Sequence, residues 1–110
     1  RIIGYSRAYE MAVTADRVSA ATALEWGLVN RVVPAEQLPE IAAAVARQLA
    51  EGPTLAFGLT KRAMQRGWGM SLDEALEYEA YLQEVAGRSA DNREGIAAFL
   101  EKRPPNFTGR

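Results

Sequence analysis

Residues 89–109 read SADNREGIAAFLEKRPPNFTG and carry more structural signals than any other stretch of the chain. Ser89 or Asp91 can cap a helix, because either side-chain oxygen can accept hydrogen bonds from the free N–H groups of a first helical turn. The apolar residues that follow are spaced as on one face of a helix. The two prolines after Arg103 make further helix unfavourable. The stretch therefore predicts a capped amphipathic helix followed by a non-helical segment with a trailing aromatic residue.

Five further helices are predicted from caps, apolar spacing and glycine or proline stops. A Ser-Leu-Asp-Glu sequence that begins at Ser71 has the spacing of a capping box, in which the serine and glutamate side chains each accept from the other's backbone N–H. Pro39 is tolerable because it falls in the first turn of its helix. The predicted helices cover residues 5–15, the segment between a Ser19 cap and Gly27, and residues 38–51, 54–66 and 71–86.

Residues 28–33 form the only credible strand, since they are short, β-branched and closed by Pro34. We therefore expect a mainly α fold for residues 1–110, with about six helices and one short strand. A chain of 110 residues has the length of one domain, and 48% hydrophobic with 25% charged residues is an ordinary globular balance.

The charge and residue composition exclude several kinds of function. Thirteen basic against fourteen acidic residues give a net charge of −1, so no strong field favours nucleic acid or an anionic membrane. No apolar run approaches the length of a membrane span. The chain contains no Cys and no His, so we expect no metal site and a reducing, cytoplasmic location. Any acid–base chemistry would have to use Asp, Glu, Lys or Tyr.

Glu79 falls inside the apolar stripe of the helix predicted at residues 71–86. A carboxylate on such a face is either half of a buried ion pair or a functional acid with a raised pKa. The ion pair is the more common case, and Lys61 or Arg62 on the preceding helix could supply its partner.

Two tryptophans and two pairs of cations are further candidates. Trp26 lies beside a helix-ending glycine, which favours a packing anchor over the turn. Trp68 lies between two glycines, where it either fills a core or lines a pocket. The cations are either simply solvated and paired with carboxylates, or able to bind an anionic ligand such as a nucleotide phosphate. They are Arg62 with Arg66 and Lys102 with Arg103.

Four segments resemble, in the same order, passages of the enoyl-CoA hydratase/isomerase (crotonase) family. The first, AVTADRVSAATA followed by WGLVNRVVP, and the last, from Asp91 to Phe107, are fairly specific, whereas the middle two are weaker. The Gly-Pro-Thr at residues 52–54 with the Lys-Arg at residues 61–62 also resembles the branch that includes epoxyphenylacetyl-CoA isomerases. The third segment is SLDEAL at residues 71–76 followed by Glu79.

The resemblance implies the C-terminal helical region of a crotonase fold. In that family a β-α spiral core binds acyl-CoA, holds the oxyanion hole and carries the catalytic acids. We find no counterpart of those segments in residues 1–110, so we expect no catalytic residue in this chain. Phe99 and Lys102 match positions that, in some members, lie beside the CoA nucleotide. The alternative is that Phe99 belongs to the core and Lys102 only interacts with the helix dipole.

The resemblance thus implies a part of an enzyme that hydrates or isomerises an acyl-CoA thioester, inactive alone, with a role in oligomerisation and at the edge of the CoA site. Coenzyme A would enter as part of the substrate, and no bound cofactor is expected. A homo-oligomer, a trimer or a hexamer, is implied, with neither nucleic acid nor membrane as a partner. The alternative is a free-standing helical module whose apolar stripes dock partner proteins.

Overall fold

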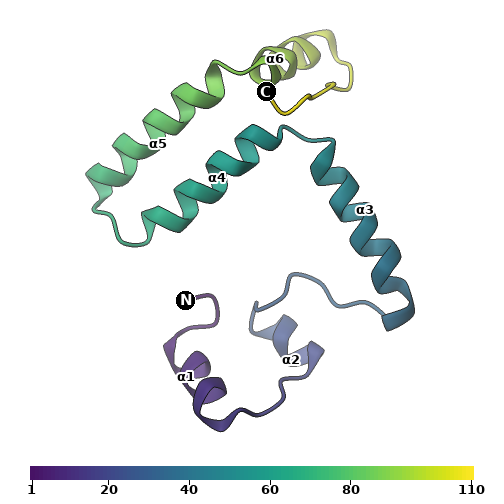
Figure 1. Ribbon diagram of the computed structural model, residues 1–110, viewed down its shortest axis with the longest axis vertical. Helices are drawn as coiled ribbons and strands as arrows, with labels where there is room; N and C mark the ends of the chain where they lie inside the picture. Colours follow the sequence, from purple (N-terminus) through teal and green to yellow (C-terminus); the bar gives the residue numbers. More distant parts are fainter. The chain divides into compact units, whose positions relative to one another are not determined.

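The computed structural model describes residues 1–110 and is built from α-helices, one short 3₁₀ helix and connecting segments, without a strand (Figure 1). The six α-helices agree with the number predicted from the sequence. The chain forms two compact units, Arg1–Ile41 and Ala42–Arg110. Each unit is described below by itself.

The first unit contains α1 (Tyr5–Thr14) and α2 (Ala20–Glu25). The hydroxyl of Ser19 accepts a hydrogen bond of 3.0 Å from the backbone N–H of Thr22, which confirms the predicted cap of α2. Gly27 follows that helix with a φ of 71°, a conformation that glycine adopts without steric cost. The predicted stop is therefore correct as well.

The predicted strand at residues 28–33 is not formed. The backbone N–H groups of Leu28 and Val29 donate instead to the carbonyl of Ala23, at 2.8 and 3.3 Å, and so complete the end of α2. A strand also requires a second extended backbone as its partner, and no sheet exists in the described chain. The β-branched composition of the segment was therefore a misleading signal, because pairing decides strand formation.

Trp26 packs over the turn that ends α2, as its position beside Gly27 predicted. The guanidinium of Arg7 on α1 lies 5.2 Å from the centre of the indole ring, a cation–π contact within this unit. The side chain is partly buried. Trp26 therefore connects α1 to the end of α2.

A 3₁₀ helix, η1 (Ala35–Gln37), leads into α3 (Leu38–Ala50), which crosses the boundary between the units. The second unit then continues with α4 (Thr54–Gly67), α5 (Leu72–Gly87) and α6 (Ala90–Glu101). Helices α4 and α5 lie side by side as an antiparallel pair joined by a short turn, and α6 packs against α5 (Figure 1).

The capping box predicted at the start of α5 is present in full. The Ser71 hydroxyl accepts from the backbone N–H of Glu74, and the Glu74 carboxylate accepts from the backbone N–H of Ser71 at 2.8 Å. That backbone hydrogen bond, together with one from the Ser71 hydroxyl, lowers the pKa of Glu74. The capping box therefore sets the residue at which α5 begins.

The hydrophobic core is small. Leu59 of α4, Leu82 of α5 and Ala98 of α6 are buried in the second unit, and Ala23 is the corresponding residue of the first. Twenty large apolar side chains are exposed, so most of the apolar stripes that define the helices face solvent. The only buried charged residue is Asp91 on α6.

Candidate functional site

The two predicted site residues, Phe99 and Lys102, lie at the C-terminal end of α6. Lys102 adopts the left-handed conformation with a φ of 55°. The next residue, Arg103, donates its backbone N–H to the Ala98 carbonyl at 3.0 Å, and Lys102 donates to the Phe99 carbonyl at 3.3 Å. These two bonds form a Schellman motif, in which glycine is the usual left-handed residue. The helix thus ends with a lysine at the position where a side chain is least expected.

Phe99 is a surface residue, with 82% of its area exposed. Its ring stands at a largely apolar pocket of about 390 Å³, which α6 forms with Ala86 at the end of α5, Pro53 and Ala56 at the start of α4, and Phe107. Phe99 is therefore not buried by the described residues, and its place beside the CoA nucleotide stays a prediction. Lys102 follows Phe99 by three residues, and its left-handed conformation places it just outside the regular helix.

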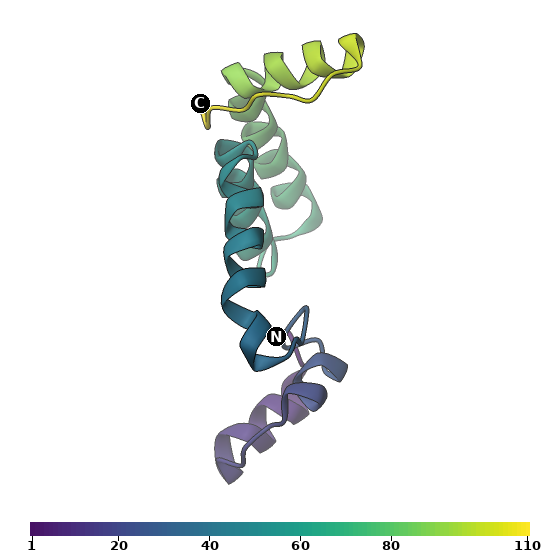
Figure 2. The same ribbon diagram turned by 90° about the vertical axis from the view of Figure 1, so that its right-hand side faces the viewer.

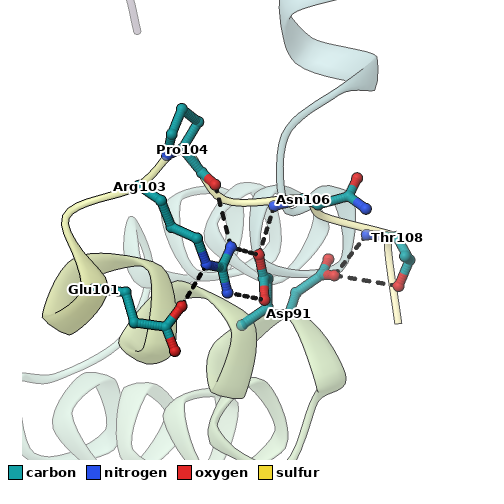
Figure 3. A network of polar contacts seen from close by, with 7 residues as sticks. Asp91, Glu101, Arg103, Pro104, Asn106 and Thr108 are labelled. Carbon is teal, nitrogen blue, oxygen red and sulfur yellow. Dashed lines mark hydrogen bonds and ion pairs between the residues drawn. The ribbon is translucent and has the colours of Figure 1, made fainter.

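Arg103, which was considered together with Lys102 as an anion-binding cation, is fully engaged within the chain (Figure 3). Its Nη1 and Nη2 donate to the two carboxylate oxygens of Glu94 at 2.6 and 2.9 Å, and its Nε donates to Glu101 at 2.6 Å. Nη1 also donates to the carbonyl of Pro104 at 3.2 Å. These hydrogen bonds, with Glu94 as the larger contributor, raise the pKa of Arg103. Lys102 is exposed and forms no ion pair in the chain.

Glu94 holds the start of the segment that follows α6. Besides the bidentate pair with Arg103, its carboxylate accepts the backbone N–H of Asn106 at 2.7 Å. The hydrogen bonds from Arg103, and then that from Asn106, lower the pKa of Glu94 to about 2. The carboxylate is therefore ionised throughout the physiological pH range.

Asp91 holds the rest of that segment, which runs back along α6 (Figure 2). Its buried carboxylate accepts from the backbone N–H of Thr108 at 2.6 Å, from the Thr108 hydroxyl at 3.3 Å and from the backbone N–H of Gly109 at 2.8 Å. Ser89, not Asp91, caps the helix by accepting from Asn92 at 3.0 Å. The sequence signal for Asp91 was read as a local cap, and only its spacing to a distant turn-forming Thr-Gly pair could have indicated this role.

A second pocket of about 610 Å³ lies between α4 and α5. Trp68 lines it with 67% of its area exposed, so of the two alternatives for this residue the pocket wall is correct and the core is wrong. Glu79 also lines it but is exposed, and neither Lys61 nor Arg62 pairs with it. The predicted buried ion pair is therefore absent, because the stripe around Glu79 is not covered.

Arg66, which with Arg62 forms the other pair of cations proposed to bind an anion, lies 5.2 Å from the centre of the Tyr78 ring on α5. No group of three or more carboxylate, His or Cys side chains is arranged to hold a metal ion.

A model of the family described as enoyl-CoA hydratase/isomerase matches residues 1–110. The chain belongs to the enoyl-CoA hydratase/isomerase family. It is 44% identical to 1,2-epoxyphenylacetyl-CoA isomerase from Escherichia coli, over 100% of this chain and 42% of that protein. It is 39% identical to crotonyl-CoA hydratase from Syntrophomonas wolfei, over 100% of this chain and 42% of that protein. The chain therefore spans less than half the length of these relatives.

The crystal structures similar to this member of the enoyl-CoA hydratase/isomerase family confirm the expected fold. An enoyl-CoA hydratase structure from Geobacillus kaustophilus matches with a TM-score of 0.91 and 45% identity, over 99% of this chain and 41% of that one. An enoyl-CoA hydratase structure from Bacillus anthracis matches with a TM-score of 0.89 and 38% identity, over 99% of this chain and 42% of that one. Hydratases and an isomerase are thus about equally similar, so identity alone does not select a branch of the family.

None of the helices combines the length and the apolar character that crossing a membrane requires.

Proposed function

We propose that residues 1–110 are the C-terminal helical part of an enzyme that hydrates or isomerises the double bond of an acyl-CoA thioester. The part contributes to oligomerisation and to the edge of the CoA site. Membership of the enoyl-CoA hydratase/isomerase family supports the substrate class. The match to about 42% of the length of the named isomerase and hydratase supports a partial contribution.

The observation that carries the CoA-edge role is that Phe99 is exposed at the end of α6 and that Lys102, three residues later, is exposed and forms no ion pair. An aromatic face can stack on the adenine of coenzyme A, and a lysine ammonium binds a phosphate as a point charge. Arg103 cannot serve in its place, because its guanidinium already binds two carboxylates and a carbonyl. Coenzyme A acts here as part of the substrate and not as a resident cofactor.

No residue of this chain is assigned to the chemical step. The proposal places the oxyanion hole and the acids that move the α-proton or activate water in the spiral core that characterises the family. Residues 1–110 then hold only the far, nucleotide end of the substrate. We expect the purified 110-residue chain to give no turnover of crotonyl-CoA above the uncatalysed rate, and measurable turnover would contradict this part of the proposal.

The exposed surface supports a role in assembly. The chain has 8995 Å² of accessible surface, whereas two separate compact units of these lengths would together expose about 7,200 Å². Twenty large apolar side chains are among the exposed residues. Burial of such surface drives association, and we propose a homo-oligomer, a trimer or a hexamer, in the cytoplasm.

A titration with coenzyme A, followed by amide NMR, tests the CoA-edge role. We expect resonances of Phe99 and Lys102 to shift with coenzyme A and to remain in place with pantetheine, which lacks the nucleotide. A Lys102→Gln variant should bind coenzyme A more weakly. Equal shifts with pantetheine, or an unchanged affinity of the variant, would show that these residues do not contact the nucleotide.

The exposed apolar stripes also favour a second candidate function, a helical docking module for other proteins. Size-exclusion chromatography with light scattering separates the two. A compact monomer that binds no apolar dye would support the module, because such a protein needs no further partner for its own stability. Self-association or strong dye binding would support the assembly role.

A further inference from the structure

Lys102 and Arg103 are neighbouring cations at the end of α6, but only Arg103 is bound by carboxylates of the chain. The guanidinium of Arg103 is bound by the carboxylates of Glu94 and Glu101, whereas Lys102 has no carboxylate partner. The bidentate pair with Glu94 fixes both the position and the orientation of Arg103, because the two parallel hydrogen bonds require one relative geometry. The two cations therefore differ in freedom, although they are adjacent in sequence.

The bound arginine directly follows the left-handed lysine. Lys102 has a φ of 55°, which a residue with a Cβ rarely adopts unless its surroundings enforce it. On one side, the Schellman hydrogen bonds tie Lys102 to α6. On the other side, the Glu94 carboxylate holds Arg103 and, at 2.7 Å, the backbone N–H of Asn106. The turn at Lys102 is thus closed at both ends, and Figure 3 shows the hydrogen bonds of Arg103 and of the Asn106 backbone on the second side.

We propose that Glu94 and Arg103 are positioning residues for the ammonium of Lys102. Their ion pair holds the left-handed turn and so fixes the direction in which the lysine side chain leaves the end of α6, which in the proposed function is towards a phosphate of coenzyme A. The same pair removes the charge of Arg103 from competition for that phosphate. The inference rests on the proposed CoA-edge function, because that function supplies the anion.

The effect of releasing the ion pair follows from the population of the turn. Without Glu94, Lys102 can leave the left-handed conformation, and its ammonium is then directed correctly only part of the time. A ligand that binds only the correct geometry loses affinity in proportion to that fraction. If the turn is kept about a fifth of the time, the dissociation constant rises about fivefold.

The test is a double-mutant cycle in the 110-residue chain, with adenosine 3′,5′-bisphosphate as the probe and its dissociation constant measured by NMR. We expect Lys102→Gln to weaken binding about tenfold, the usual effect of losing one charge-assisted hydrogen bond. Glu94→Gln should weaken binding about threefold to tenfold although Lys102 is still present. In the Lys102→Gln background, Glu94→Gln should have no further effect.

The matched control is Glu84→Gln, which removes a carboxylate from the exposed Glu84–Arg88 pair on α5 and should leave binding unchanged. Arg103→Lys keeps the charge and loses the bidentate geometry, so it should behave like Glu94→Gln. Circular dichroism of each variant should show that the helices are intact. If the Glu94→Gln variant were unfolded, Arg103→Lys would replace it in the double-mutant cycle with Lys102→Gln.

The outcomes separate the inference from the function on which it rests. If the wild-type chain does not bind the probe, or if Lys102→Gln binds equally well, the proposed CoA-edge function is wrong and the inference falls with it. If Lys102→Gln weakens binding but Glu94→Gln does not, the function stands and the positioning role is wrong. Additive effects of the two substitutions would also contradict it, because Glu94 would then act independently of Lys102.

Discussion

The carboxylate of Asp91 accepts a hydrogen bond of 2.8 Å from the backbone N–H of Gly109, a residue eighteen positions further along the chain. The same buried carboxylate accepts both donors of Thr108. In return, the carbonyl of Arg110 accepts the backbone N–H of Asp91 at 3.0 Å. One side chain in the first turn of α6 thus closes residues 103–110 into a hairpin-like loop against the helix.

Replacement of Asp91 by Ala should destabilise the second unit by about 2–3 kcal/mol, because it removes the charged acceptor of the hydrogen bonds from Thr108 and Gly109. Urea denaturation measures the loss. Asp73→Ala is the matched control, since Asp73 also lies two positions after a serine cap but is exposed. We expect it to cost less than about 1 kcal/mol, the contribution of a carboxylate to the helix dipole. Equal losses in both variants would show that Asp91 acts only as a helix-terminal charge.

The contact between Glu94 and residues 103–106 should depend on pH only in acid. Because the Arg103 and Asn106 hydrogen bonds lower the pKa of Glu94 from 4.5 to about 2, the ionised form stabilises the folded state. That stabilisation is complete above pH 4.5, decreases as the pH falls and is lost near pH 2. Amide hydrogen exchange of Asn106 between pH 7 and 2 measures it. In Glu94→Gln, Asn106 should already exchange fast at pH 7, with no such transition.

The helix boundaries were predictable because the signals that set them are local. The hydroxyls of Ser19, Ser71 and Ser89 each accept from the backbone three residues ahead, so a short stretch of sequence contains both partners. Gly27 marks the end of α2 through its own φ of 71°, which glycine adopts without steric cost. These signals can therefore be recognised without knowing the rest of the fold.

The features that the sequence did not predict depend on residues far apart in the chain, or on helix faces against which no other element packs. The anchoring role of Asp91 needs partners seventeen and eighteen positions away. The segment at residues 28–33 has strand-like composition but no second strand to pair with. The ion pair favoured for Glu79 requires a buried helix face, yet Glu79 is exposed. Apolar spacing indicates which face a helix can bury, and not whether anything covers that face.

Gly95 within α6 and Gly109 in the segment that follows this helix should respond in opposite ways to replacement by alanine. A Cβ at Gly95 would lie 3.6 Å from the Phe107 ring, an ordinary contact, so Gly95→Ala should stabilise the unit by about 0.5–1 kcal/mol through its helix propensity. Gly109 has a φ of 79°, and a Cβ there would lie 2.5 Å from the Thr54 hydroxyl oxygen.

Gly109→Ala should therefore cost about 1 kcal/mol or more, because alanine disfavours that backbone conformation. Thermal denaturation of the two variants side by side measures both effects. A destabilised Gly95→Ala would mean that the Phe107 ring has no room to accept the methyl group. An unchanged Gly109→Ala would mean that the end of the loop does not hold its position against Thr54.

Replacement of Lys102 by glycine should raise the stability of the folded chain and lower its affinity for coenzyme A. Glycine adopts a φ of 55° more readily than lysine does, so Lys102→Gly should stabilise the folded chain by about 0.5–1 kcal/mol. Lys102→Ala removes the same ammonium but keeps the Cβ, and should give no such gain. Both variants should lose affinity for coenzyme A to the same extent. Denaturation and NMR titration of the pair measure the two effects separately. If Lys102→Gly were instead less stable than Lys102→Ala, the left-handed backbone conformation of Lys102 would not destabilise the folded chain. A role in binding would then not be needed to explain why a lysine occupies this position.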